Sequence, residues 1–184
     1  MKKILLVAAL IAAFTTGAYA QTENGFGGQV EVGYGLKMND KLNVFQVSLM
    51  PGYHFGPYLF AGVGVGFNSY SANGESISTF PIFAHGTVNF TSGTTWTPFL
   101  AAKVGYGIGK RTESLDGANY ELKSGFYFAP SLGMKYKVSP QYAVSLALFY
   151  DAMGFKETVT ELGELPASAT TTNSAIGLRL GFEF

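Results

Sequence analysis

Apolar and polar side chains alternate along most of the chain after residue 27, in segments of about ten residues separated by polar connections. Alternation with a period of two predicts β-strands, because successive side chains of a strand point to opposite faces of the sheet. No charged residue falls on the apolar side of any such segment. Eight strands are expected, at about residues 28–38, 43–55, 58–67, 79–90, 98–109, 126–138, 142–152 and 176–184.

The opposite side of the same strands carries the charged residues and most of the glycines, among them Glu31, Lys103, Lys135, Asp151, Arg179, Glu183, Gly33 and Gly64. A soluble barrel would expose this side to water, where glycines only weaken the strands. In a membrane barrel the apolar side faces lipid and the polar side lines the lumen. Eight strands enclose a lumen that side chains can fill, and glycines there make room for larger neighbours. The pattern therefore predicts an all-β fold, an eight-stranded antiparallel up-and-down transmembrane β-barrel.

The expected connections alternate in length. Those at 56–57, 91–96 and 139–141 are short, whereas those at 68–78, 110–125 and 155–172 are long and polar; the first, at 39–41, is short as well. Short periplasmic turns and long external loops are typical of outer-membrane barrels. Aromatic residues on the apolar side gather near the two rims and predict two interfacial girdles: Tyr53, Phe90, Tyr136, Tyr142, Phe182 and Phe184 near the termini, and Phe45, Phe67, Phe80, Tyr106, Phe126 and Tyr150 at the other rim.

The first twenty residues predict a cleavable export signal. Lys2 and Lys3 precede an uncharged apolar run that is too short to anchor the chain in a bilayer. The expected cleavage-site residues are Ala18, Ala20 and Gln21. A buried N-terminal helix is the alternative. Cleavage would leave one domain, residues 21–184, with a net charge of −2.

Composition narrows the function classes. The chain of 184 residues has 12 basic and 12 acidic residues, so its balance of charge disfavours nucleic-acid binding. Charged residues make up 13% and aromatic residues 15% of the chain. A disordered chain has the opposite composition, with many charged and few aromatic residues. The absence of cysteine from the sequence excludes disulfides, thiolate nucleophiles and cysteine-ligated metals.

The last strand, from Ile176 to Phe184, resembles the closing strand of Gram-negative outer-membrane barrels. Such strands end in an aromatic residue after alternating apolar positions, which here are Leu180, Phe182 and Phe184. Segments 80–85 and 97–106 resemble the small "outer membrane β-barrel" or "porin family" proteins common in Bacteroidota, which are OmpA/OmpX-like eight-stranded barrels. The resemblance implies a place in the cell outer membrane, with both termini periplasmic. It also implies contact with membrane lipid and lipopolysaccharide, and recognition of the last strand by the barrel-assembly machinery.

Candidate chemistry is sparse. The glycine runs at 62–66 and 105–109 lie inside strands and lack the spacing and following helix of a nucleotide loop. His54 and His85 have no acidic or cysteine neighbour at metal-ligand spacing. We therefore expect no catalytic, cofactor or metal site.

One cluster is expected in the lumen. The first and last strands must be neighbours if the barrel closes, and Glu31 and Arg179 then fall in its lower to middle part. Lys103, on the opposite wall, points into the same narrow space. An unpaired charge there would be costly, so Glu31 is expected to pair with Arg179, with Lys103 or a water completing the cluster. Separate contacts of each charge with lumen water are the alternative.

The function expected from these features is a non-enzymatic barrel that presents surface loops for envelope integrity, adhesion or contact with host or environmental molecules. An unknown extracellular partner is expected to bind through the loops, and no nucleic acid is expected. One alternative is a lipid A-modifying membrane enzyme, for which His85 and Thr87 are the nearest match to a catalytic pair. The other is a soluble, secreted ligand-binding barrel of lipocalin type.

Overall fold

The computed structural model describes residues 24–37, 42–72, 75–91, 93–115, 118–139, 141–160 and 167–184. The expected cleavage-site residues Ala18, Ala20 and Gln21 lie outside the described residues. Within the described ranges, no helix is long and apolar enough to cross a membrane.

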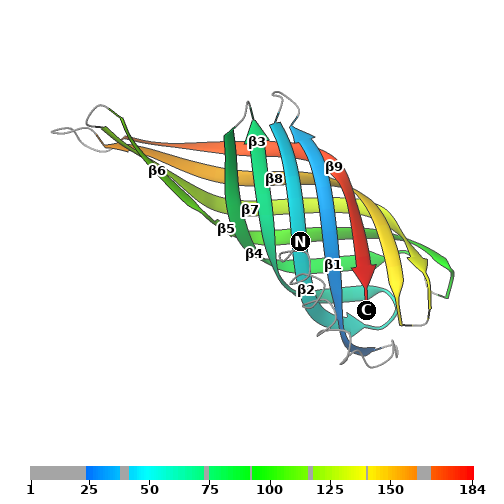
Figure 1. The fold of residues 1–184 in the computed structure, drawn as a ribbon. Helices are drawn as coiled ribbons and strands as arrows, with labels where there is room; N and C mark the ends of the chain where they lie inside the picture. The colour runs from blue at the N-terminus through cyan, green and yellow to red at the C-terminus, as the bar shows by residue number, and fades with distance from the viewer. Residues whose placement is uncertain are drawn as a thin grey trace, which may run out of the picture.

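The described residues form a continuous wall of antiparallel strands (Figure 1). The strands are β1 (Asn24–Lys37), β2 (Leu42–Phe55), β3 (Leu59–Ala72), β4 (Glu75–Asn89), β5 (Trp96–Ile108), β6 (Lys110–Leu115), β7 (Ala118–Lys137), β8 (Ala143–Thr160) and β9 (Ala167–Glu183). Their order is β5-β4-β3-β2-β1-β9-β8-β7-β6, and pairing of β5 with β7 closes the wall. Because β5 and β6 are separated only by Gly109 and both pair with β7, they share one position in the wall. The predicted closed eight-stranded barrel is confirmed.

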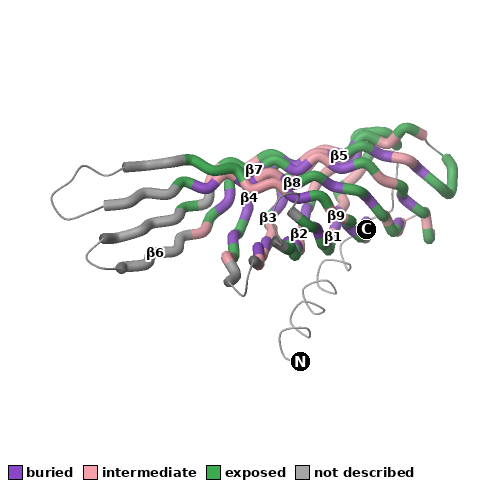
Figure 2. The backbone as a smooth tube through the Cα atoms, turned by 90° about the horizontal axis from the view of Figure 1, so that it is seen from above, coloured by how far each residue is buried: buried purple, intermediate pink, exposed green. Residues whose placement is uncertain are grey.

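The two faces of this wall have opposite chemistry. Large apolar side chains point outward and are exposed, as at Val63, which is 65% exposed. Charged side chains point inward, where Lys103 is 1% and Arg179 2% exposed. Figure 2 shows the resulting alternation of buried and exposed residues along the strands. This is the reverse of a soluble protein, and it is the arrangement that a lipid-facing wall requires.

The two ends of the barrel differ in the length of their connections. We call "terminal end" the one that holds Asn24, Phe184 and the connections 56–58, 90–95 and 138–142. At the other end, here the "hairpin end", the segments expected as long loops are mostly paired strand. β7 pairs with β6 and β8 as far as residues 118–119, and β8 pairs with β9 as far as Val159. These hairpins extend well beyond the tops of β1 and β2 (Figure 1).

The prediction of loops at 68–78, 110–125 and 155–172 was therefore wrong for most of these residues, which belong to strands. Strands were recognised by alternation of apolar and polar residues, which arises only where one face meets lipid. In these segments the buried residues Tyr70 and Phe155 lie on the inner face, so the outward apolar pattern stops, while the ladder still satisfies the backbone hydrogen-bonding groups.

Glycines of the inner face give space to aromatic rings. A Cβ atom at Gly52 would lie 2.5 Å from the Phe60 ring, and one at Gly33 would lie 3.3 Å from the Phe149 ring. At the terminal end, Gly56 has a φ of 68°, which glycine adopts without strain, and it forms the tight β2–β3 turn. The small residues therefore allow bulky side chains to enter a narrow lumen.

Candidate functional site

A central network of charged residues crosses the lumen. Glu31 on β1 forms an ion pair with Lys103 on β5, with Nζ and Oε2 2.6 Å apart. Arg179 on β9 approaches the same oxygen, with Nε at 3.5 Å. Lys103 also donates a hydrogen bond to Ser48 Oγ at 3.0 Å. The structure thus brings together the three residues that the sequence placed in one cluster, and Lys103 is the closer partner of Glu31.

This network continues toward the hairpin end through groups that were not assigned to the cluster. Arg179 Nη2 donates to Gln46 Oε1 at 2.9 Å, and Gln46 Nε2 donates to Asp151 Oδ2 at 2.6 Å. The Tyr70 hydroxyl donates to the other oxygen of Asp151 at 2.9 Å. The network therefore holds two carboxylates, Glu31 and Asp151, and two cations, so its formal charges balance.

Aromatic rings cover the cations of the lumen. Lys103 Nζ lies 5.1 Å from the centre of the Phe83 ring, and Arg179 Cζ lies 4.4 Å from that of Phe149. Both rings are buried and belong to the inner face. Contacts of this kind stabilise a cation that has lost its water. These phenylalanines were not singled out from the sequence, although their place among the charged positions, rather than the apolar ones, was a usable signal.

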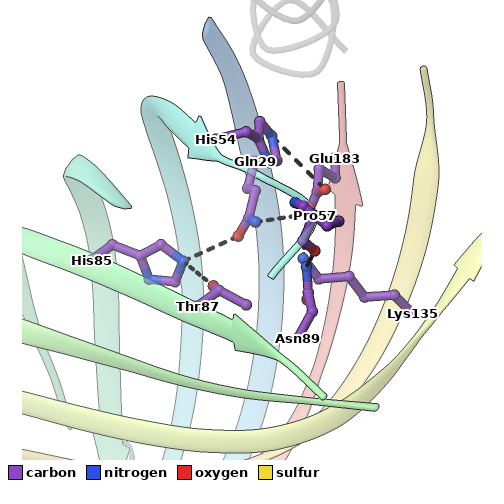
Figure 3. Close-up of polar contacts among 8 residues, drawn as sticks. All are labelled: Gln29, His54, Pro57, His85, Thr87, Asn89, Lys135 and Glu183. Atoms are coloured by element: carbon purple, nitrogen blue, oxygen red, sulfur yellow. Dashed lines mark hydrogen bonds and ion pairs between the residues drawn. The ribbon is translucent and has the colours of Figure 1, made fainter. Parts of the chain in front are cut away.

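A second network lies at the terminal end and is drawn in Figure 3. Glu183 Oε2 accepts from Lys135 Nζ at 2.5 Å and from Gln29 Nε2 at 2.8 Å. His54 Nε2 lies 4.0 Å from Glu183 Oε1. Lys135 and Glu183 were expected to line the lumen, but the sequence did not join these residues into a site, because their contacts depend on register across β1, β2, β7 and β9.

His85 and Thr87 do contact one another, with Nε2 and Oγ1 2.9 Å apart. The same ring nitrogen lies 3.1 Å from Gln29 Oε1, while Nδ1 has no hydrogen-bond partner among the described residues. A catalytic triad uses one ring nitrogen for the nucleophile and the other for an acid. Both side chains are also buried in the lumen. This geometry is that of a polar bridge between strands.

A cavity of about 210 Å³ opens beside the second network. We call it the vestibule; its lining is His54, Gly56, Pro57, Asn89, Thr91, Thr97, Lys135, Lys137, Ala143 and Glu183. Pro57 is exposed, so the vestibule reaches the surface at the terminal end. The side chains of Lys135 and Glu183 therefore have water within reach, whereas the central network is enclosed by Phe83, Phe149 and the barrel wall.

The last residues of the chain, Leu180, Phe182 and Phe184, differ in which side of the wall their side chains occupy. Leu180 points outward and is exposed, and the Phe182 ring stacks on Tyr142 at a centroid distance of 5.6 Å. Phe184, expected in the exposed girdle, is only 7% exposed. Its backbone exchanges two hydrogen bonds with Gly28, and a Cβ atom at Gly28 would lie 2.7 Å from its ring. The ring occupies the place that a side chain at position 28 would take.

Metal binding finds no support in these networks. In the part of the chain that the structure describes, no group of three or more His, Asp or Glu residues could hold a metal ion.

The comparisons with known proteins agree with this architecture. The family described as "outer membrane protein beta-barrel domain" matches residues 6–184. The chain belongs to this family. Membership, together with the outward apolar wall, indicates an outer-membrane location. A search of curated proteins finds no match.

Several solved barrels of this family's fold are similar to the chain. Neisserial surface protein A is 13% identical with a TM-score of 0.57, over 88% of this chain and 96% of that one. The outer membrane protein AlkL, solved in lipid bilayers, is 14% identical with a TM-score of 0.59, over 90% and 92%. OprG from Pseudomonas aeruginosa is 15% identical with a TM-score of 0.55, over 88% and 93%. At such identities the likeness establishes the fold alone.

Proposed function

We propose that this outer-membrane barrel is non-enzymatic and acts by presenting its hairpin end at the cell surface. The observation that carries the proposal is the difference between the two ends. β7, β8 and β9 have 20, 18 and 17 residues, whereas a membrane-spanning strand needs about 9–11. The excess gathers at one end as paired hairpins, which form a stable platform for contact with envelope components, host molecules or surfaces.

The proposed orientation puts both termini in the periplasm after export through the signal at residues 1–20. Since the chain has no cysteine, single cysteines can report on it. Lys123→Cys, near the hairpin end, is expected to react with a membrane-impermeant maleimide on intact cells. Gln141→Cys, in the β7–β8 connection, is expected to react only after the outer membrane is opened. The opposite labelling pattern would reverse the orientation.

The lumen is proposed to be plugged by its polar networks. The fully buried side chains of Arg179, Lys103, Tyr127, Phe60 and Met50 support this, because they come from different sides of the barrel. Single-channel recording in planar bilayers tests the plug. We expect no steady ion conductance from the wild-type barrel, and a stable conductance would contradict it.

Neither alternative fits the site as well. A lipid A-modifying enzyme needs a nucleophile, a base and an acid at the outer rim, whereas His85 and Thr87 are buried and the second nitrogen of His85 has no acidic partner among the described residues. Mass spectrometry of lipid A after overexpression tests this alternative. A lipocalin-type barrel needs an apolar lumen and a polar exterior, and the exposed leucines and valines here have the reverse arrangement.

Shortening the hairpins tests the platform. Replacing residues 111–122 by Asn-Gly keeps the Lys110–Lys123 pair, and replacing 157–169 by Asn-Gly keeps the Lys156–Thr170 pair. We expect both variants to retain the heat-dependent gel migration of a folded barrel but to lose binding in a screen of the intact barrel against extracellular proteins, glycans and lipopolysaccharide. Unchanged binding would overturn the platform.

We also propose that the barrel-assembly machinery recognises the last strand through Leu180, Phe182 and Phe184. Removing Phe184 is expected to lower the amount of assembled barrel in the outer membrane, as measured by heat-dependent migration of membrane fractions. The matched control is Phe182→Leu, which keeps an apolar outward residue and the terminal ring. Normal assembly without Phe184 would mean that its ring only fills the place beside Gly28.

A further inference from the structure

The vestibule at the terminal end contains polar atoms that the described residues leave without partners. Thr97 is 3% exposed and His54 9%, yet Thr97 Oγ1 and His54 Nε2 have no hydrogen-bond partner in the described part of the chain. Asn89 Oδ1 is in the same condition. All three residues line the cavity. Buried polar groups are normally satisfied, so several unsatisfied ones around one space indicate that something polar occupies it.

The charge of the vestibule favours an anion. Glu183, its only acidic lining residue, is already paired with Lys135 and accepts from Gln29. Lys137 adds a second cation to the lining, and none of the ion pairs among the described residues involves it. One positive charge therefore remains uncompensated in the lining, which also contains Thr97. A volume of about 210 Å³ far exceeds the ~30 Å³ that one water takes in the liquid, so an oxyanion fits.

Asn89 narrows the class of anion. Its Nδ2 donates to the Pro57 carbonyl at 3.0 Å, as Figure 3 shows, and this contact fixes which amide atom is which, because a carbonyl can only accept. The remaining Oδ1 is an acceptor and needs a donor from the ligand. Phosphate near neutral pH keeps at least one P–OH group, whereas sulfate has none.

We propose that the vestibule binds a phosphate-type oxyanion: Lys137 and Thr97 donate to its oxygens, and its P–OH donates to Asn89. The residues of the strands that line the cavity belong to the lumen side rather than the lipid side of the wall. The ligand is therefore inorganic phosphate from the water phase, because a phosphomonoester is mostly a dianion without a P–OH group near neutral pH. The site lies at the end opposite the surface platform and does not depend on it.

Titration of the folded barrel with inorganic phosphate, in maltoside micelles and phosphate-free buffer, tests the site through amide chemical shifts. Saturable binding is expected in the wild type. Lys137→Gln and the nearly isosteric Thr97→Val are each expected to weaken it about tenfold. Lys156→Gln, the same charge change near the hairpin end, is the matched control and should bind as the wild type does. Absent saturation, or equal losses in all three variants, would overturn the site.

A second titration, with sulfate in place of phosphate, tests the role of Asn89. The wild type is expected to prefer phosphate to sulfate by about tenfold, and Asn89→Ala to remove most of this preference. Equal binding of both anions by the wild type would overturn the role of Asn89. In nanodiscs of phosphatidylglycerol the phosphate affinity should equal that in maltoside. A marked loss of phosphate affinity in these nanodiscs would mean that lipid headgroups occupy the vestibule. That result would overturn the proposal of a water-borne ligand. Heat-dependent migration verifies that each variant is folded.

Discussion

The two polar networks of the lumen are built around the same pair of residue types in different surroundings. Glu31 and Lys103 lie 2.6 Å apart in the centre, and Glu183 and Lys135 lie 2.5 Å apart at the terminal end. The central pair is joined by Arg179, whereas the terminal pair borders the vestibule; both lysines lie over aromatic rings, Lys103 over Phe83 and Lys135 over Phe99. The same two residue types thus form a pair once away from the vestibule and once beside it.

This difference determines what each pair contributes. A buried charge that loses its partner has nothing to replace it, and its desolvation cost remains. A charge beside a hydrated space can turn toward water instead. We therefore expect the central network to be sensitive to any loss of charge, and the terminal network to tolerate it. A barrel in which both networks respond alike would contradict the comparison.

The largest effect is expected from Glu31→Gln, which leaves Lys103 and Arg179 without the carboxylate that contacts both. Removing one partner of a buried ion pair costs about 3–5 kcal/mol. The matched change Glu183→Gln should cost only about 1–2 kcal/mol, because Lys135 can then reach vestibule water. Unfolding by urea in detergent, followed for both variants, measures the difference. Equal losses would mean that the central network is as wet as the vestibule.

The next effect compares the two sides of one strand. Lys103 is 1% exposed in the lumen, whereas its neighbour Val104 points outward and is 45% exposed. Val104→Lys should therefore destabilise the barrel by about 2–4 kcal/mol if position 104 lies near the bilayer midplane. Val104→Ile is the control and should be nearly neutral. Folding titrations into lipid vesicles give both values, and a neutral lysine at 104 would place that position outside the lipid.

The inner and outer sides of β5 also show how much of the structure could be predicted from the sequence. Alternation placed Lys103 inside and Val104 outside, because lipid on one face selects apolar residues at every second position. The meeting of Glu31, Lys103 and Arg179 could be proposed since closure makes β1 and β9 neighbours. The link to Asp151 through Gln46 could not, because it depends on register and on side-chain reach across β2, β8 and β9.

The hairpin end and the vestibule were missed for a different reason. In strand extensions such as 153–160 the apolar residues Met153 and Phe155 lie on the inner face and are buried, so the pattern of outward apolar positions ends before the strand does. The vestibule is formed by turns and strand ends that only the closed barrel brings together, among them Pro57, Thr97 and Lys137. No local spacing in the sequence encodes such a space.

A smaller effect distinguishes direct contact from shared burial. In a double-mutant cycle, Glu31→Gln and Arg179→Met should be non-additive by about 1–3 kcal/mol, since both act on one network. The corresponding cycle of His54→Gln and Glu183→Gln should show a smaller coupling, about 0.5 kcal/mol, because that contact is longer, at 4.0 Å, and borders the vestibule. Additive losses in the first cycle would show that Glu31 stabilises the barrel through Lys103 alone.

The smallest expected effect is a dependence on salt. Because the vestibule reaches the surface, we expect ions to enter it and to screen the Glu183–Lys135 pair; at about 1 M salt the screening length is only ~3 Å. The destabilisation caused by Glu183→Gln should therefore fall by about 0.5–1 kcal/mol between low and high salt. Glu31→Gln should destabilise the barrel equally at both, because its partners Lys103 and Arg179 are 1% and 2% exposed and no ion reaches them. Urea unfolding of both variants and of the wild type is measured at each salt concentration. Subtracting the wild-type free energy of unfolding removes the general effect of salt on the barrel. If the destabilisation caused by Glu31→Gln depends on salt, ions pass Phe83 and Phe149, and the proposed plug is open.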